Sequence, residues 1–297
     1  MKSGLQALSD SAAILDLSDR GRIRVTGEDR ARLLHAMTTN HVQGMKPGEV
    51  QYTFFLNAQG QIQADAWILC FEDHFLIDVE PQTRQSLYDR LDRFIIADDV
   101  TLEDVTEQTY SLGLEGPDAL RIAGGTGVAI SFTGAPGVRI YGPVEGKDAV
   151  QEELAHAGAV EATADDAETS RVMHFTPRYG RDITDRSLPQ ETQQIKSAVH
   201  FQKGCYLGQE IVERVRSRGH VNRLLMGFTG DSEQAPAVGA KVAYGGKEDG
   251  EVTSAVAVDG KFYGLAIVRA QIAQPGILVG IDGRPATLAA PHVIAGS

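Results

Sequence analysis

Cysteine is almost absent from this chain, whose 297 residues include only Cys70 and Cys205. Two thiols cannot build a disulfide framework. They are also too few for a zinc or iron–sulfur site that takes four thiolates from one chain. Metal chemistry of that kind would need ligands from another molecule.

Long hydrophobic runs are missing as well. The longest uninterrupted apolar stretch covers residues 66–71, whereas a membrane-spanning helix needs about 20 residues. Residues 1–10 have no continuous apolar segment of the kind found in secretory signals. The sequence therefore predicts a cytoplasmic protein without a membrane partner.

Positive charge is scarce, with 28 Lys and Arg against 40 Asp and Glu and a net charge of −12. Because binding to a phosphate backbone depends on a basic footprint, direct nucleic-acid binding is disfavoured. A hydrophobic content of 42%, with 32 Gly and 11 Pro, excludes disordered and collagen-like classes.

Hydrophobic periodicity predicts an α+β fold in the first part of the chain. Two similar successions of strands and helices appear, which indicates two α/β modules. The expected strands are residues 51–56, 61–71, 75–79, 100–105, 110–114, 128–132 and 138–141, and the expected helices include residues 28–39, one opening at Pro81, and 147–156.

The pattern changes near Arg223. Four short strands then alternate with Gly-Gly, Asp-Gly and Pro-Gly turns, and residues 229–237 read as a loop or linker. This spacing is typical of a small β-barrel or sandwich. We therefore expect one domain over residues 1–222 and a C-terminal β-barrel domain over residues 223–297.

A basic strip interrupts the acidic chain between residues 196 and 223. It carries a formal charge of +4, which leaves −16 on the rest of the chain. Such a strip could attract a compact anion, although a solvated helix face would show the same pattern. Its basic residues are Lys196, Lys203, Arg214, Arg216, Arg218 and Arg223.

The sequence KGCYLGQE at residues 203–210 places Cys205 between two glycines, ahead of an amphipathic helical pattern. A tight loop at a helix N-terminus, with Lys203 beside it, would favour a reactive thiolate. The alternative is that Cys205 is a small buried hydrophobe, as the apolar setting of Cys70 suggests for that residue. A cysteine hydrolase would need His200 or His220 as its base.

Asp65 alternates with apolar residues along the expected strand 61–71, and it shares a strand face with Trp67. An acid beside an indole could line a cleft that stacks a flat heterocycle. The alternative is a solvent-facing acid on an edge strand.

The motif at residues 203–210 resembles the signature of the YgfZ family, which are folate-binding proteins of the aminomethyltransferase superfamily that act in iron–sulfur cluster assembly or repair. Further similarity lies in residues 188–191 (LPQE), 38–40 (TTN), 46–48 (KPG) and 57–67. Together these segments span most of the chain.

The resemblance implies two interleaved α/β modules that form a folate-binding body around a central channel, followed by a C-terminal β-barrel. It implies tetrahydrofolate as the cofactor, with Asp65 near its N5 atom and Glu191 at the pterin. An arginine downstream matches either Arg218 or Arg223. Trp67, Lys203 and Tyr206 complete the residues expected at the folate.

Three hypotheses about function follow from these features. The main one is a tetrahydrofolate-binding protein that assists iron–sulfur cluster assembly or repair through Cys205, with client or assembly proteins as partners. The alternative is a folate-dependent aminomethyl or one-carbon transferase that uses Asp65 as an acid–base group. The third, a tRNA-binding or tRNA-modifying protein, is disfavoured by the net charge.

Overall fold

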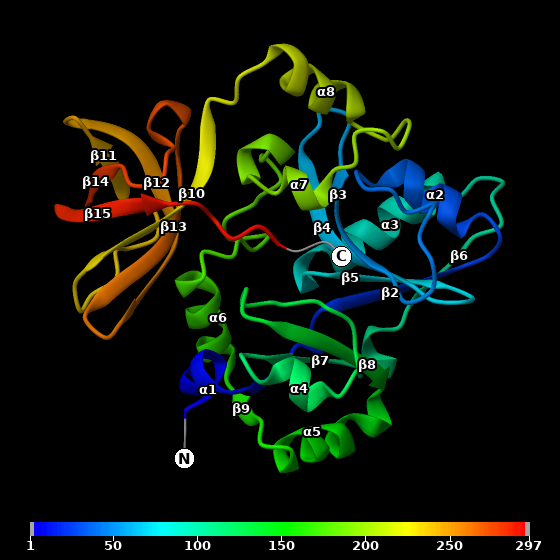
Figure 1. The fold of residues 1–297 in the computed structure, drawn as a ribbon. Helices are drawn as coiled ribbons and strands as arrows, with labels where there is room; N and C mark the ends of the chain where they lie inside the picture. The colour runs from blue at the N-terminus through cyan, green and yellow to red at the C-terminus, as the bar shows by residue number, and fades with distance from the viewer. Residues whose placement is uncertain (1–2, 295–297) are drawn as a thin grey trace.

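Two β-sheets with covering helices and a separate barrel make up this computed structural model, which describes residues 3–294 (Figure 1). The first sheet is antiparallel, with strand order β3-β4-β5-β2-β6. Its strands are β2 (Gly21–Thr26), β3 (Val50–Leu56), β4 (Ile62–Cys70), β5 (Phe75–Val79) and β6 (Thr101–Asp104). Helices α2 (Arg30–Met37) and α3 (Arg84–Phe94) bury Leu34 and Leu91 against one face of this sheet.

The opposite face of the first sheet also lies inside the molecule. Tyr52 and Trp67 share a second apolar core with Tyr206 and Ile294, which come from distant parts of the chain. This burial on both faces explains why β3 and β4 carry nearly continuous apolar residues.

The second sheet has the order β8-β7-β1-β9. The N-terminal strand β1 (Ala13–Asp16) pairs antiparallel with β7 (Thr109–Glu115) and parallel with β9 (Val160–Ala162). Strand β8 (Gly137–Pro143) completes the sheet. β1 precedes the strands of the first sheet in the sequence, but it pairs with β7 and β9, which follow them. The predicted interleaving of two modules is therefore confirmed.

Helices lie on both sides of the second sheet. Its helices are α1 (Gly4–Asp10), α4 (Ala119–Ala123), α5 (Lys147–His156) and α6 (Ala164–Met173). α4 and α5 contribute to one apolar core and α1 and α6 to another. A capping box of Thr163 and Asp166 begins α6.

Residues 128–132 do not form the predicted strand. Val128 makes a single bridge to Arg139. The buried carboxylate of Glu115 accepts the N–H groups of Phe132 and Thr133 at 2.6 and 2.9 Å. These donors are therefore committed to a side chain and cannot join a strand ladder.

The C-terminal strands form a closed barrel in the order β10-β13-β12-β11-β14-β15. They are β10 (Arg223–Asp231), β11 (Lys241–Tyr244), β12 (Lys247–Val258), β13 (Lys261–Arg269), β14 (Leu278–Ile281) and β15 (Arg284–Ala289). The predicted loop at residues 229–237 begins three residues too early, because Thr229, Gly230 and Asp231 still belong to β10 and pair with β13. After β15 the chain returns to the body as far as Ile294.

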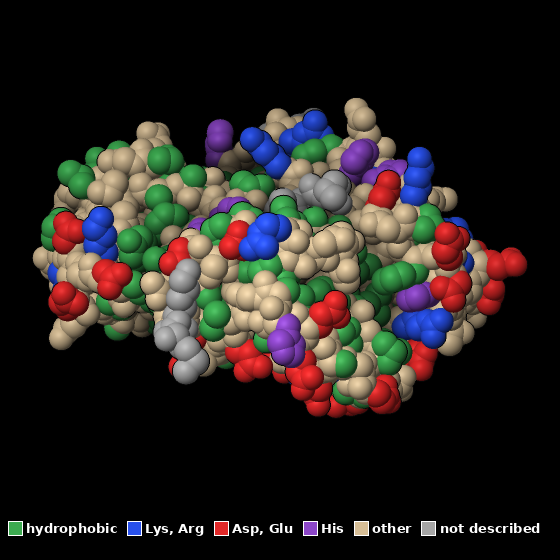
Figure 2. Space-filling model, turned by 60° about the horizontal axis from the view of Figure 1, so that its bottom comes forward, with side chains coloured by type: hydrophobic (Ala, Val, Ile, Leu, Met, Phe, Trp, Pro, Cys, Tyr) green, Lys and Arg blue, Asp and Glu red, His purple; other side chains and the backbone are tan. Residues whose placement is uncertain are grey.

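Short helices connect these parts. They are α7 (Ile195–Ala198), α8 (Gln209–Arg218), and the 3-10 helices η1 (Pro81–Thr83), η2 (Thr106–Gln108), η3 (Val144–Gly146), η4 (Pro189–Thr192) and η5 (Ala270–Ile272). No helix within residues 3–294 is long and apolar enough to cross a membrane. Acidic side chains gather along the lower edge of the face in Figure 2, in keeping with the negative net charge.

Candidate functional site

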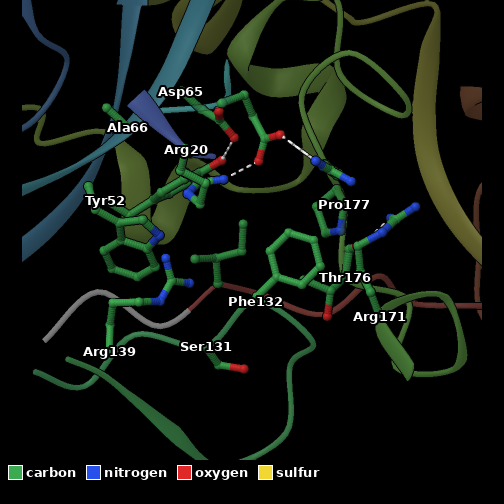
Figure 3. A pocket seen from close by; sticks show the side chains of 14 residues that line it. Arg20, Tyr52, Asp65, Ala66, Ser131, Phe132, Arg139, Arg171, Thr176 and Pro177 are labelled. Atoms are coloured by element: carbon green, nitrogen blue, oxygen red, sulfur yellow. Dashed lines mark hydrogen bonds and ion pairs between the residues drawn. The ribbon is translucent and has the colours of Figure 1, made fainter. Parts of the chain in front are cut away.

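A cavity lies where the two modules and the C-terminal segment meet (Figure 3). The first sheet supplies its acidic and aromatic wall, and the second module supplies the opposite wall. The lining residues used below are Arg20, Tyr52, Asp65, Trp67, Glu80, Phe132, Arg139, Arg171, Arg178 and Ile294.

Asp65 lies on β4 between β3 and β5, with a side chain that is almost completely buried. The alternative of a solvent-facing acid on an edge strand is therefore wrong. Oδ2 of Asp65 accepts a 2.7 Å hydrogen bond from the phenol of Tyr52.

Burial raises the pKa of Asp65 to about 6, and the negative charge of Glu80 adds to the rise. The Tyr52 hydrogen bond and the charge of Arg20 oppose it. A carboxyl group with a pKa in this range can exchange a proton near neutral pH.

Two further buried acids, Asp78 and Glu80, belong to the same ionic network, and Glu80 lines the cavity. The guanidinium of Arg20 pairs with both Asp78 and Glu80. Arg178 binds Glu80 from the other side, with 2.8 Å between Nη2 and Oε2. The acid Glu80, which acts on Asp65, is thus fixed by two arginines.

Aromatic rings line the same space. Trp67 is buried, with its ring centroid 5.3 Å from that of Tyr52. Phe132 lies on the opposite wall, where the guanidinium carbon of Arg178 is 5.1 Å from the ring centroid. Walls of this kind suit a flat, partly polar ligand.

Glu191 and Arg223 lie together, but along a different groove. Their side chains form an ion pair with 2.9 Å between Arg223 Nε and Glu191 Oε1. The second carboxylate oxygen of Glu191 accepts the backbone N–H of Leu188. Both residues line a groove between the body and the barrel. Among the described residues, Glu191 does not line the cavity that contains Asp65.

Cys205 is exposed in the loop before α8, so the alternative of a buried cysteine is wrong for this residue. Cys70 is buried, and burial raises the pKa of its thiol. Neither His200 nor His220 makes a hydrogen bond to Cys205 among the interactions described for residues 3–294.

Among the described residues, the amine of Lys203 bonds to backbone carbonyls and not to the thiol of Cys205. Its buried amine bonds to the carbonyl oxygens of His35 and Thr38, the latter at 2.5 Å. Burial lowers the pKa of Lys203 to about 7, and a neutral amine still has the two N–H donors that two carbonyls require. Its Nζ also lies 4.9 Å from the ring centroid of Tyr206.

The predicted site residues therefore fall into three places. Asp65 and Trp67 share the cavity, Glu191 and Arg223 share the groove, and Cys205, Lys203 and Tyr206 belong to the loop before α8. Arg218 ends α8, and its side chain is outside the described part of the structure. No group of three or more His, Cys, Asp or Glu suited to a metal ion occurs within the described residues.

The C-terminal segment closes one side of the cavity, which the sequence gives no means of predicting. The buried amide of Gln194 holds this segment through both of its polar atoms. Nε2 donates to the carbonyl of His292, and Oε1 accepts the N–H of Ile294, each at 2.8 Å. Ile294 packs in the same core as Trp67.

Comparison with known proteins gives three findings. Residues 1–127 match the family model described as the GCVT N-terminal domain. A chloroplastic protein of Arabidopsis thaliana named as a transferase is 28% identical over 94% of this chain and 70% of its own length. An aminomethyltransferase of Geobacillus kaustophilus is also 28% identical, over 96% of this chain and 86% of its own length.

A solved structure has the same fold. Glycine cleavage system aminomethyltransferase T from Bartonella henselae superposes with a TM-score of 0.85, covering 97% of this chain and 87% of its own, at 18% identity. The α+β body with a C-terminal barrel is therefore an aminomethyltransferase-like fold. The cytoplasmic location stays a prediction, since one relative is chloroplastic.

Proposed function

We propose that this chain, which carries a GCVT N-terminal domain and has an aminomethyltransferase-like fold, is a tetrahydrofolate-dependent transferase of a one-carbon group. The observation that supports this proposal is Asp65, a buried carboxyl group with a pKa near 6 in a cavity with aromatic walls. The names of the two relatives support it at the level of the reaction class.

The residues of the cavity fit a reduced pteridine. Such a ring is flat and carries several N–H groups, for which a carboxylate is a good acceptor. Trp67 and Phe132 offer apolar faces, and Asp65 offers the acceptor. When bound, tetrahydrofolate would supply the nitrogen that receives the one-carbon group.

The role of Asp65 is proton exchange at its carboxylate. Tyr52 fixes Oδ2 and so limits rotation of the carboxyl group. Burial and, after it, the charge of Glu80 keep the pKa of Asp65 high, while Arg20 and Arg178 hold Glu80 in place. Ile294 and Trp67 help exclude water from this side of the cavity.

Two measurements test the proposal. Calorimetric titration of tetrahydrofolate should give saturable binding to the wild type and to Glu152→Gln, which changes an exposed acid on α5. A one-carbon transfer assay to tetrahydrofolate should show turnover that disappears in Asp65→Asn and survives in Cys205→Ala. Wild-type protein that binds no tetrahydrofolate would exclude this function.

The YgfZ-type function in iron–sulfur cluster assembly or repair is a second candidate, favoured by the exposure of Cys205. Under this proposal the thiol acts on a client protein or cluster, and Asp65 serves only to bind folate. Folate binding without turnover, together with loss of client maturation in Cys205→Ala, would support it. Turnover that does not depend on Cys205 would count against it.

The resemblance also assigns Glu191 to the pterin, and that assignment stays a prediction. Because Glu191 already pairs with Arg223, a pterin contact would have to share or replace this ion pair. Calorimetry of Glu191→Ala tests the assignment, which requires weaker tetrahydrofolate binding. Unchanged affinity for tetrahydrofolate would mean that Glu191 has only a structural role, in the ion pair that connects η4 to β10.

A further inference from the structure

Arg139 is a buried arginine whose guanidinium group is only weakly bound by the protein. It lies on β8 with 1% of its surface exposed, and it lines the same cavity as Asp65. Nη1 makes two long contacts, 3.4 Å to Asp78 Oδ2 and 3.5 Å to Ser111 Oγ. Its Nε–H has no acceptor among the described residues.

Asp78 cannot satisfy Arg139, because other donors already occupy its carboxylate. Tyr141 donates a hydrogen bond of 2.7 Å to Oδ2, and Arg20 binds Oδ1. The contact with Arg139 is the longest of the three. Asp78 would therefore keep two close donors if Arg139 were replaced.

Arg171 shows what full satisfaction looks like in the same cavity. It is equally buried. Its Nη1 donates to the carbonyl of Thr176 at 2.6 Å and pairs with Asp182 at 2.8 Å, while Glu168 and Ser254 accept from its other nitrogens. The fold thus saturates one buried guanidinium and leaves donors of the other unused.

A buried donor without an acceptor destabilises a protein, and a charged one does so more strongly. Such a group in a folded protein needs an explanation, and a functional role is one of the recognised explanations. In Figure 3 the side chain of Arg139 rises toward the aromatic rings on the Tyr52 side of the cavity, with Phe132 farther across. The unpaired Nε–H therefore belongs to a residue of the cavity wall.

We propose that Arg139 binds a carboxylate group of a ligand that enters the Asp65 cavity. The planar fork of a guanidinium matches a carboxylate. The subsite rests on the proposed function in so far as the carboxylate is either part of the folate or belongs to a second substrate.

Acetate serves as the probe, with Trp67 as the reporter, since it is the only tryptophan in the chain and lines this cavity. Replacing sodium chloride by sodium acetate at constant ionic strength should change Trp67 fluorescence saturably. Arg139→Met should weaken this response about tenfold or more. Arg121→Met, which alters an exposed arginine on α4, should respond like the wild type.

A second variant and a second readout guard against misfolding. Arg139→Lys keeps the charge without the fork and should bind acetate more weakly than the wild type. In the wild type, acetate should protect Arg139 from phenylglyoxal, with the modified residue identified by mass spectrometry. A subsite for a separate acid would be overturned if folded Arg139→Met and Arg139→Lys gave the same saturable Trp67 response to acetate as the wild type. It would also be overturned if acetate neither changed the Trp67 fluorescence of the wild type nor protected Arg139 from phenylglyoxal.

Two folate compounds separate the sources of the carboxylate. If it comes from the glutamate part of the folate, Arg139→Met should bind tetrahydrofolate as weakly as the wild type binds tetrahydropteroate, which lacks glutamate. If it comes from a separate acid, Arg139→Met should bind tetrahydrofolate normally while losing acetate. Normal binding of both folates and of acetate by Arg139→Met would overturn the proposal.

These arms also distinguish failure of the subsite from failure of the proposed function. The acetate titration needs no folate, so an Arg139-dependent response in a protein that binds no tetrahydrofolate would uphold the subsite and exclude the folate function. If tetrahydrofolate binding and turnover do not depend on Arg139 and acetate gives no response, the folate function is upheld and the subsite is excluded.

Discussion

The phenol of Tyr52 on β3 donates a 2.7 Å hydrogen bond to Oδ2 of Asp65 on the neighbouring strand β4. This bond stabilises the ionised form of a carboxyl group whose surroundings otherwise favour the neutral form. The hydrogen bond from Tyr52 therefore lowers the pH range over which Asp65 exchanges its proton, against the effects of burial and Glu80.

Tyr52→Phe should raise the pKa of Asp65 above its value of about 6, because the variant removes a group that lowers it. Carbon-13 NMR of the aspartate carboxyl groups measures this pKa directly. Tyr88→Phe is the matched control, since it also removes a phenolic hydrogen bond, to Leu102, but away from the cavity. An unchanged or lower pKa in Tyr52→Phe would contradict the assigned role.

The raised pKa of Asp65 makes a pH-dependent contribution to stability. Between pH 3.8, the ordinary pKa of an aspartate, and about pH 6, the folded state holds a proton that the unfolded state has released. The contribution of Asp65 to the free energy of unfolding therefore falls as pH rises through this window. Two pKa units correspond to about 3 kcal/mol.

Urea unfolding of the wild type and Asp65→Asn at pH 4 and pH 7.5 tests this contribution. The stability of the wild type relative to Asp65→Asn should fall by up to about 3 kcal/mol between the two pH values. Glu152→Gln removes an exposed acid and should show no comparable change. A constant difference between wild type and Asp65→Asn would mean that Asp65 has an ordinary pKa.

Gly60 allows the β3–β4 turn to pack against α8. It has a φ of +73°, and a Cβ atom there would lie 2.8 Å from Cβ of Ile211. Gly60→Ala should therefore lower the free energy of unfolding by more than the ~1–2 kcal/mol expected from backbone strain alone. Gly48→Ala is the control, because its φ is +91° but nothing lies within 4 Å of a Cβ.

Thermal or urea unfolding of both glycine variants gives the comparison. The extra destabilisation of Gly60→Ala over Gly48→Ala measures the packing between the turn and α8. Equal losses in the two variants would show that this packing yields without penalty.

Gln194→Ala should release the C-terminal segment from the cavity. The variant removes the acceptor for the N–H of Ile294 and the donor for the carbonyl of His292. Hydrogen exchange at the Ile294 amide should accelerate, and global stability should fall by about 1–3 kcal/mol. Gln190→Ala is the control, because it removes a single hydrogen bond, from η4 to the carbonyl of Val212 on α8. It should leave the Ile294 amide protected.

Cys205 should react with iodoacetamide long before Cys70 in the folded protein, because only Cys205 is exposed. Mass spectrometry should find one modified thiol in the native wild type and none in Cys205→Ser at the same time point. Both thiols of the wild type should react in urea. Early modification of Cys70 would mean that the first sheet opens readily.

Local sequence signals predicted the elements that they specify on their own. Alternation and turns located β3, β4 and four of the six barrel strands, β11 to β14, and helical spacing located α3 and α5. Strands β10 and β15 were not predicted. The capping box of Thr163 and Asp166 could have located α6. Strand β1 was missed because four residues carry little pattern, and its partners β7 and β9 lie far along the sequence, with Ala13 opposite Glu115 and Val160.

The candidate site was predicted only where a single strand carries it. Asp65 and Trp67 lie two residues apart on β4, so their shared face could be read from alternation. Glu80, Arg20 and Arg139 were missed because they meet Asp65 through pairing between distant strands and across two modules. The hydrogen bonds of Lys203 could not be predicted, since its partners, the carbonyls of His35 and Thr38, lie at the end of another helix.

The position of β1 determines how the protein can be assembled during synthesis. β1 is synthesised before its hydrogen-bonding partners β7 and β9, and all the strands of the first sheet are synthesised in between. A polypeptide cut between β6 and β7 would leave β1 on one fragment and its sheet on the other. The two fragments should therefore reassemble through β1, and an N-terminal deletion past Asp16 should prevent the second module from closing.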